Sequence, residues 1–233
     1  MTKTRPILAV SLSAILAACG AQAGEADSAN AAIAPVEVKA PAGTYTLEKT
    51  HAALIWSIPH MGLSDYHARF TQFDATVTLD PKDLENSAVE LTLDPKSVRT
   101  DFPLDYKMVH PESKFANWDE EIALEEGKLA AGDGKAITFK STAVEPTGPR
   151  TANIVGNLTM RGQTRPITLE AKFNGELESH PFMKVPVIGF NASGVIKPSE
   201  YGVNLYGGAL GDAVTIRFSG EFLHKAEKSA EPE

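Results

Sequence analysis

The chain has 233 residues, of which 42% are hydrophobic, and its 30 acidic and 22 basic residues give a formal charge of −8 at pH 7. This acidic balance excludes the basic surface by which proteins bind nucleic acid, and it disfavours direct attraction to anionic lipid. Once the terminal segments are set aside, about 180 residues remain, which suits one well-buried domain.

The first 18 residues have the pattern of a secretory signal. Lys3 and Arg5 precede an uncharged run from Ile7 to Ala18 that ends in small residues. A positive start followed by about a dozen apolar residues is typical of such signals, whereas a bilayer span needs about 20. We therefore predict that residues 1–18 are removed, which leaves a mature chain with 20 basic and 30 acidic residues.

Cys19, the only cysteine of the chain, follows this run directly. The sequence Leu16-Ala17-Ala18-Cys19 resembles the bacterial lipobox, in which the cysteine is acylated and becomes the new N-terminus. We predict lipidation at Cys19, attachment to the membrane through this N-terminal lipid anchor, and a periplasmic location. Gly20 stands where aspartate commonly retains lipoproteins in the inner membrane, which favours the outer membrane. The alternative is an ordinary secretion signal with an incidental cysteine, or a buried free thiol.

The segments at the two ends of the mature chain lack any sustained hydrophobic pattern. Residues 19–42 are rich in alanine and small polar residues and contain Pro35 and Pro41, so we expect a flexible tether. Residues 225–233 are mostly charged or small, and we expect a disordered tail. The predicted domain is therefore 43–224, and it holds no disulfide because it has no cysteine.

Within this domain, apolar residues recur with a period of two. The alternating runs are 54–60, 73–79, 89–93, 137–140, 154–160, 167–173 and 214–222, and a further strand is expected over 187–195. Typical turn sequences separate the runs: Asp80-Pro81-Lys82, Asp94-Pro95-Lys96, Gly132-Asp133-Gly134, Thr147-Gly148-Pro149 and Arg161-Gly162-Gln163. Many short strands with one inward face predict an all-β antiparallel fold, either a closed barrel or a sandwich.

One stretch, 101–128, breaks the alternation. Phe115, Trp118 and Ile122 are spaced like one face of a helix, and Pro111-Glu112-Ser113 is a plausible helix start. We expect a short helical connector, which either plugs one end of the barrel or acts as a mobile lid over it.

Several motifs, in this order and spacing, resemble the YceI-like family. The quoted stretches are Tyr45-Thr46-Leu47-Glu48-Lys49-Thr50-His51, Trp56-Ser57-Ile58-Pro59-His60-Met61-Gly62, Phe70-Thr71-Gln72-Phe73, Ser97-Val98-Arg99-Thr100, Ile137-Thr138-Phe139-Lys140-Ser141-Thr142 and Gly156-Asn157-Leu158-Thr159-Met160-Arg161-Gly162-Gln163-Thr164-Arg165-Pro166-Ile167. The resemblance covers residues 44–222. It implies a closed antiparallel lipocalin-like β-barrel of about eight strands and an association with polyisoprenoid binding.

The chain departs from the family pattern at two places. Leu104-Asp105-Tyr106-Lys107-Met108 replaces an Arg-Asp-x-His-Leu motif, and Lys197-Pro198-Ser199-Glu200-Tyr201-Gly202 replaces Arg-Ser-Asp-Phe-Gly. Both departures lie outside the clearest strands, so they bear on ligand specificity rather than on the fold.

An apolar lipid ligand needs apolar walls, and the inward-facing positions supply them. The predicted ligand-binding residues are Leu54, Trp56, Ile58, Phe73, Val77, Phe139, Leu158, Met160 and Phe190. His60 continues the Leu54 face, and we expect it to meet a ligand headgroup with help from Arg69; alternatively, His60 bonds a backbone carbonyl. The same apolar residues could instead fill a solid core. No cofactor other than a bound apolar lipid is expected.

Two other functional classes were weighed against a lipid carrier. The sequence contains no nucleophile and base at a recognisable spacing, and no His-Glu-x-x-His, which argues against an enzyme. His60 and His67 flank a turn and could share a metal ion. A tethered module that presents an outer surface, such as residues 181–198, to an envelope partner is the third possibility, and a cavity-free barrel would favour it.

Overall fold

The computed structural model describes residues 36–205 and 210–225, which form ten β-strands and two short α-helices. The strands are β1 (Gly43–His60), β2 (Ser64–Phe70), β3 (Phe73–Leu79), β4 (Ala88–Leu93), β5 (Val98–Arg99), β6 (Ile137–Gly148), β7 (Thr151–Met160), β8 (Gln163–Leu177), β9 (Val187–Ile196) and β10 (Val214–His224). The helices are α1 (Tyr106–Val109) and α2 (Trp118–Leu124). The predicted signal, Cys19, residues 19–35 of the expected tether and residues 226–233 of the expected tail lie outside the described residues.

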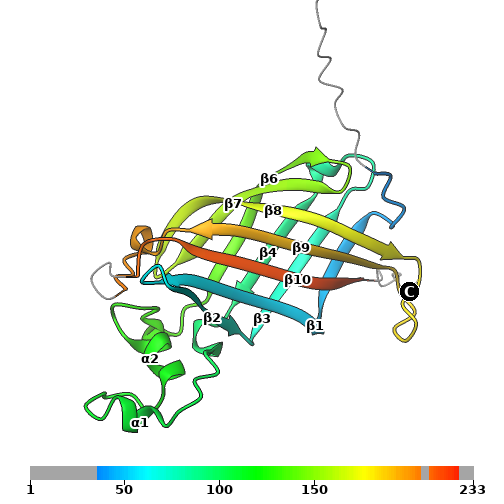
Figure 1. Cartoon of the computed structure of the whole chain (residues 1–233). Coiled ribbons are helices and arrows are strands. Elements are labelled where there is room, and N and C mark those ends of the chain that lie inside the picture. The colour runs from blue at the N-terminus through cyan, green and yellow to red at the C-terminus, as the bar shows by residue number, and fades with distance from the viewer. Residues whose placement is uncertain (1–35, 206–209, 226–233) are drawn as a thin grey trace, which may run out of the picture. The chain divides into compact units, whose positions relative to one another are not determined.

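The strands form one antiparallel sheet that closes on itself (Figure 1). Its order is β10-β9-β8-β7-β6-β4-β3-β1-β2-β5, and β10 also pairs with β1. The first half of β1 pairs with β3 and the second half with β2, so β2 and β3 act as one bent strand beside β1. The result is a closed barrel of eight antiparallel strands, which confirms the predicted barrel and excludes a sandwich.

A bulge in β1 decides which of its residues face the interior. Between Glu48 and Ala53, β1 advances five residues while its partner β10 advances only two, from Glu221 to Ser219. An odd number of extra residues exchanges the two faces of a strand. The inward face therefore moves from odd-numbered residues such as Tyr45 to even-numbered residues such as Leu54.

The Glu48 carboxylate organises this bulge. It accepts hydrogen bonds from the backbone N–H groups of Thr50 and His51, at 3.1 and 3.0 Å, and from the Thr50 hydroxyl at 2.7 Å. The hydrogen bond from the Thr50 side chain is the main reason that the pKa of Glu48 is lowered. The motif from Tyr45 to His51 is therefore a structural device that brings Leu54 and Trp56 to the interior.

The connector between β5 and β6 differs in detail from the prediction. Helix α2 begins at Trp118 rather than near Pro111, because the Asn117 side chain caps it by accepting a hydrogen bond from the Glu120 N–H at 2.8 Å. Residues 111–113 instead form a turn after α1, and Phe115 is buried ahead of the helix. The expected helical face is thus only partly helical.

The folded part of the chain begins before residue 43, the expected start of the domain. Ala40 is buried, and the backbone N–H groups of Lys39 and Ala40 donate to the Glu176 carboxylate at 2.9 and 2.7 Å. Val36 N–H donates to the Pro149 carbonyl at 2.6 Å. Residues 36–42, assigned above to the tether, therefore pack across one end of the barrel.

Candidate functional site

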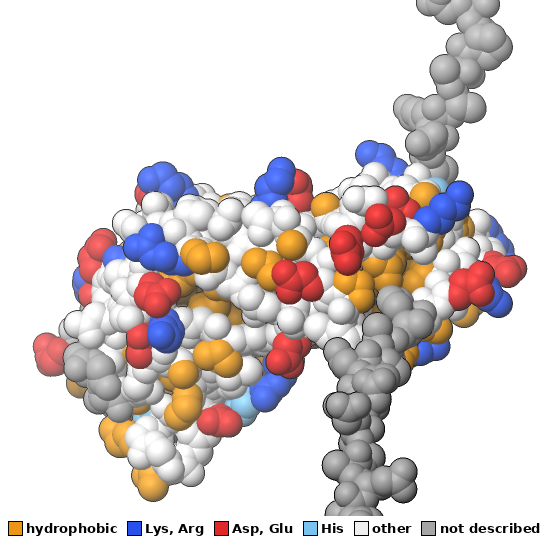
Figure 2. Space-filling model, turned by 90° about the horizontal axis from the view of Figure 1, so that it is seen from above, with side chains coloured by type: hydrophobic (Ala, Val, Ile, Leu, Met, Phe, Trp, Pro, Cys, Tyr) orange, Lys and Arg blue, Asp and Glu red, His pale blue; other side chains and the backbone are white. Residues whose placement is uncertain are grey.

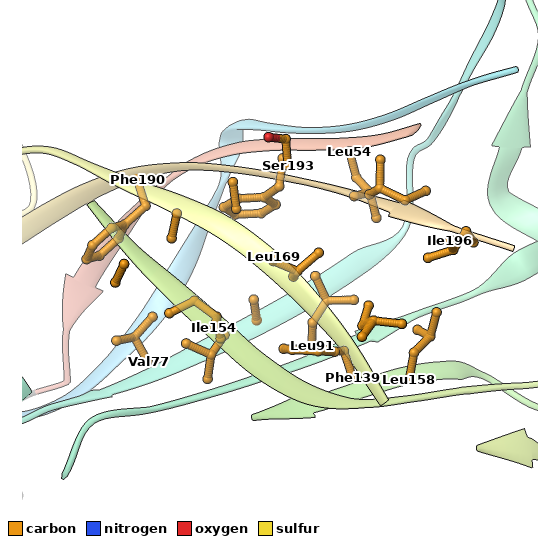
Figure 3. Close-up of a pocket in the computed structure, with 18 of the residues that line it drawn as sticks. Leu54, Val77, Leu91, Phe139, Ile154, Leu158, Leu169, Phe190, Ser193 and Ile196 are labelled. Atoms are coloured by element: carbon orange, nitrogen blue, oxygen red, sulfur yellow. The ribbon is translucent and has the colours of Figure 1, made fainter. Parts of the chain in front are cut away.

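The barrel encloses a cavity of about 300 Å³. Each of the eight strands contributes apolar side chains to its wall, and Figure 3 shows many of them converging on one space. One representative from each strand, in chain order, gives Leu54, Val77, Leu91, Phe139, Ile154, Leu169, Phe190 and Ile216. The volume lies at the lower end of the range typical of small-molecule sites.

The inward face of β8 shows that this interior is hollow. Ile167, Leu169, Ala171 and Phe173 all line the cavity, yet each keeps part of its surface exposed, and no residue of β8 is fully buried. In a solid core, inward apolar residues of a central strand would be packed to native density and buried. The cavity-free barrel that would have favoured an interaction module is therefore not what the structure shows.

The cavity reaches solvent at the end that carries the β6–β7 turn. Pro149, Arg150 and Thr151 line it there and are exposed, and Val36 and Val38 of the N-terminal segment complete the rim. In the view of Figure 2, exposed hydrophobic side chains are seen toward both ends of the barrel. We call this end the mouth.

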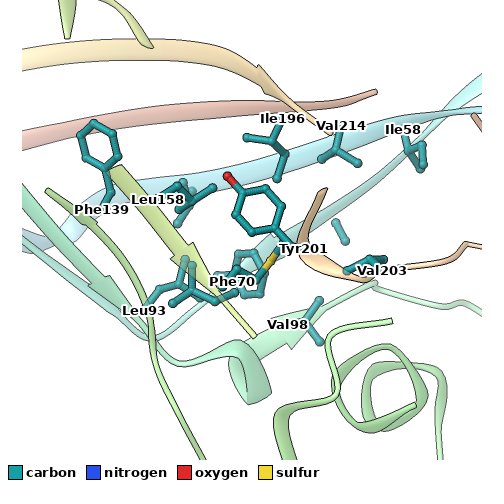
Figure 4. Close-up of a cluster of buried hydrophobic side chains, with 14 of the residues drawn as sticks. Ile58, Phe70, Leu93, Val98, Phe139, Leu158, Ile196, Tyr201, Val203 and Val214 are labelled. Atoms are coloured by element: carbon teal, nitrogen blue, oxygen red, sulfur yellow. The ribbon is translucent and has the colours of Figure 1, made fainter. Parts of the chain in front are cut away.

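The opposite end is closed by the connector and by the segment after β9. Ile122 of α2, Val203 and Met160 line the cavity there and are buried. Tyr201, which is 2% exposed, packs among the same apolar cluster (Figure 4). In this conformation residues 101–128 close the barrel like a plug.

Hydrogen bonds among buried side chains hold the connector in place at the closed end of the barrel. The buried Lys128 ammonium donates to the Glu121 carboxylate at 2.6 Å and lies 5.4 Å from the centre of the Trp118 ring. The Tyr106 hydroxyl also donates to Glu121. Burial opposes ionisation of Glu121, but the hydrogen bonds from Lys128 and Tyr106 outweigh it, and the pKa of Glu121 is lowered. Arg161, at the β7–β8 turn, adds a hydrogen bond to the Lys128 carbonyl at 3.3 Å.

Two buried donors near the closed end are unsatisfied within the part of the chain that the structure describes. They are the Nε1 atom of Trp56, on the cavity wall, and the hydroxyl of Tyr201. An unpaired polar group in an apolar surrounding lowers stability. Burial, followed by the negative charge of Glu200, raises the pKa of Tyr201.

The structure brings seven of the predicted ligand-binding residues together on the cavity wall: Leu54, Trp56, Val77, Phe139, Leu158, Met160 and Phe190. Ile58 and Phe73 also point inward but belong to the packed apolar clusters rather than to the wall. Contact of any of these residues with a ligand stays a prediction.

His60 and Arg69 are not at the cavity. His60 is exposed at the end of β1, and the Arg69 guanidinium forms an ion pair with Asp101 at 3.2 Å in solvent. Arg69 pairs with Ile55 across the ladder, so it lies on the opposite face from His60. The sequence predicted His60 to line the interior because it continues the face of Leu54. Alternation does not show, however, where along its length a strand extends beyond the barrel.

The register also separates the two histidines considered as a metal pair. His67 pairs with Ser57, which places it on the face of the sheet opposite to His60. Across residues 36–205 and 210–225, no group of three or more His, Cys, Asp or Glu side chains could hold a metal ion.

The predicted site residues do not include all of the cavity wall. Leu91, Ile154 and the inward residues of β8 line the cavity but were not among the predicted site residues. Their signal is present in the sequence, because each belongs to an alternating run that predicts a strand.

The family model of the YceI-like domain matches residues 45–222. The chain belongs to the YceI-like family. This match covers all eight strands of the barrel wall and so includes every strand that lines the cavity.

Relatives of this YceI-like protein include UPF0312 proteins of Pseudomonas. One from Pseudomonas putida strain GB-1 is 33% identical over 167 residues, covering 71% of this chain and 79% of the relative. One from Pseudomonas paraeruginosa strain DSM 24068 / PA7 is 31% identical over 189 residues, covering 80% and 90% respectively.

Solved structures share the fold at low sequence identity. BcnA of Burkholderia cenocepacia superposes with a TM-score of 0.61 at 18% identity, over 75% of this chain and 98% of BcnA. A polyisoprenoid binding domain from Saccharophagus degradans gives a TM-score of 0.52 at 12% identity, over 78% and 98% of the two chains. At such identities the likeness shows the fold alone.

None of the helices in the described ranges is both long and apolar enough to span a bilayer.

Proposed function

We propose that this YceI-like protein binds a slender, isoprenoid-like apolar lipid inside its barrel and carries it without catalysing a reaction. The apolar cavity, lined from all eight strands and open at one end, carries this proposal. The likeness to a polyisoprenoid binding domain supports the same class of ligand.

The energetics favour a long, thin, apolar ligand over a compact polar one. Transfer of each methylene from water to an apolar wall contributes about 0.8 kcal/mol, so an isoprene unit gains roughly 4 kcal/mol before the costs of ordering. The wall near its middle is formed by side chains such as Leu91, Leu169 and Ile154, which offer a ligand no hydrogen bond. A polar group there would lose its water without replacement.

The cellular setting is part of the proposal. A lipid anchor at Cys19 would hold the barrel in the periplasm, at the outer membrane. Residues 20–35 would then link the anchor to the barrel, and they join it at the mouth, where Val36 lies.

The test is mass spectrometry of lipids extracted from residues 20–233, secreted into a bacterial periplasm and purified without detergent. We expect one prenyl-chain species at near one per protein. Ala171→Trp, which fills the cavity from β8, should abolish this occupancy. Lys172→Trp, on the outer face of the same strand, should retain it.

Other results would count against the proposal in different ways. A fatty acid or a mixture of lipids would retain the cavity as a lipid site but refute isoprenoid specificity. No lipid in a folded barrel, or equal occupancy in both tryptophan variants, would refute binding inside the barrel.

A further inference from the structure

The loop between β8 and β9, residues 178–186, is an ordered turn. His180 N–H donates to the Val185 carbonyl at 2.7 Å, and Lys184 N–H donates to the His180 carbonyl at 3.0 Å. The Nδ1 atom of the His180 ring accepts from the N–H groups of Phe182 and Met183, at 3.2 and 3.1 Å. The backbone of the loop tip is therefore satisfied by the turn itself.

This ordered turn presents large apolar side chains to solvent. Phe182 is 86% exposed and Met183 is 57% exposed, and Leu177 at the end of β8 is 52% exposed. Because the turn is held by its own hydrogen bonds, their exposure is a feature of the folded loop. Phe182 and Met183 are neighbours on the turn, so together they form one small exposed apolar tip at this end of the barrel.

The loop lies at the mouth of the cavity. It joins the mouth-side ends of β8 and β9, two strands that line the cavity through Phe173 and Phe190 (Figure 1). Glu176, two residues before the loop, binds the N-terminal segment through the N–H groups of Lys39 and Ala40. Lys39 and Ala40 of the N-terminal segment therefore lie beside the end of β8 that leads into this loop.

The 178–186 loop carries no net charge and presents only a small apolar area. Glu178 and Lys184 are its charged residues, so no cluster of one sign surrounds the tip. Two side chains on one turn fall far short of the roughly 800 Å² per partner that a stable protein interface buries. The same two side chains suit insertion into a bilayer surface, where apolar burial alone favours binding.

We propose that the 178–186 loop docks the barrel on a lipid bilayer, with Phe182 and Met183 inserted among the acyl chains. Docking at this end places the mouth against the membrane, so that a water-insoluble ligand passes between bilayer and cavity without crossing water. Docking through this loop rests on the proposed lipid-carrier function, and the two experiments below test docking and carrying separately.

The first experiment measures insertion in the full chain. Phe182→Trp is mixed with vesicles of phosphatidylethanolamine and phosphatidylglycerol whose acyl chains are brominated, and tryptophan fluorescence is recorded. Leu63→Trp is the matched control, because Leu63 is 85% exposed in the β1–β2 turn at the closed end of the barrel. We expect the fluorescence of Phe182→Trp to be quenched more than that of the unsubstituted chain. The fluorescence of Leu63→Trp should be quenched no more than that of the unsubstituted chain. Since no cationic cluster surrounds the tip, quenching should not fall as the salt concentration is raised.

The second experiment measures ligand uptake from the same vesicles without bromine, loaded with radiolabelled solanesol, a long-chain prenol. Phe182→Ser/Met183→Ser should slow uptake at least about tenfold, since two apolar side chains no longer leave water. Met61→Ser/Leu63→Ser, which removes two exposed apolar side chains at the opposite end, should leave the rate unchanged.

The two readouts distinguish failure of docking from failure of the carrier function. Absent quenching at position 182, equal quenching at both positions, or measurable uptake at equal rates in the two serine variants would overturn docking through this loop. Quenching at position 182 without solanesol uptake by any variant would uphold docking and refute prenol binding. Uptake without quenching would do the reverse.

Discussion

The hydroxyl of Tyr201 offers a direct test of how dry the closed end of the barrel is. Tyr201 is 2% exposed, lies among apolar side chains, and its hydroxyl has no partner within the described ranges. Tyr201 stands where the family motif that this stretch replaces has phenylalanine. Tyr201→Phe therefore removes one buried oxygen atom and leaves the ring in place.

The expected magnitude follows from the missing hydrogen bond. An unsatisfied buried hydroxyl costs about 1–3 kcal/mol, because it gives up its water without a replacement. The packing lost with a single oxygen is small by comparison. We expect Tyr201→Phe to raise the free energy of unfolding by about 1 kcal/mol, or the melting temperature by about 2–4 °C in a domain of this size.

The assay is urea denaturation, in which a shift of the midpoint at constant slope reports stability alone. Tyr106→Phe is the matched control. Tyr106 is 5% exposed, and its hydroxyl bonds Ser113 at 2.5 Å and donates to Glu121. The same chemical change at this site should lower stability by about 1–3 kcal/mol, the opposite sign.

A loss of about 1 kcal/mol or more in Tyr201→Phe, at unchanged slope, would refute this reasoning. It would mean that the hydroxyl is hydrogen-bonded in solution, for example to a buried water, and that the closed end is wet.

Two further predictions concern the barrel wall and its response to pH. Gly156→Ala should lower the free energy of unfolding by about 1–3 kcal/mol, because the new Cβ would lie 2.4 Å from the ring of Phe139. Gly132→Ala, where no atom lies within 4 Å of the new Cβ, should be near neutral in the same denaturation assay, and equal losses would contradict the packing argument. Burial raises the pKa of Tyr45 to about 12, above the value of about 10 in the unfolded chain, so its contribution to stability is full below pH 10 and is lost between about pH 10 and 12. Tyr45→Phe should make the loss of stability over this range less steep, and an identical pH profile would disprove the assignment.

Local patterns in the sequence predicted the strands well, because each strand and turn is specified by residues close together in the chain. The Arg161-Gly162-Gln163 turn does join β7 to β8, and the run 167–173 is part of β8. Asn117 and Glu120 also have the spacing of a helix start, so the sequence contains the signal for the observed cap, although the predicted start was near Pro111.

What the sequence did not predict depends on contacts between distant segments. The face exchange in β1 follows from its register with β10, and the position of Arg69 on the face opposite to His60 follows from the β1–β2 register. The packing of residues 36–42 depends on Glu176, more than a hundred positions away.

The sequence by itself determined that the chain forms antiparallel strands with one apolar face, and its motifs indicated the family. Whether those apolar faces meet in a solid core or surround a space was decided only by the tertiary structure. Side chains such as Leu169 and Phe173 are equally suited to either, since both outcomes remove apolar surface from water. The number of strands in the closed barrel fixes its diameter, and at eight strands the side chains of this chain leave a cavity of about 300 Å³.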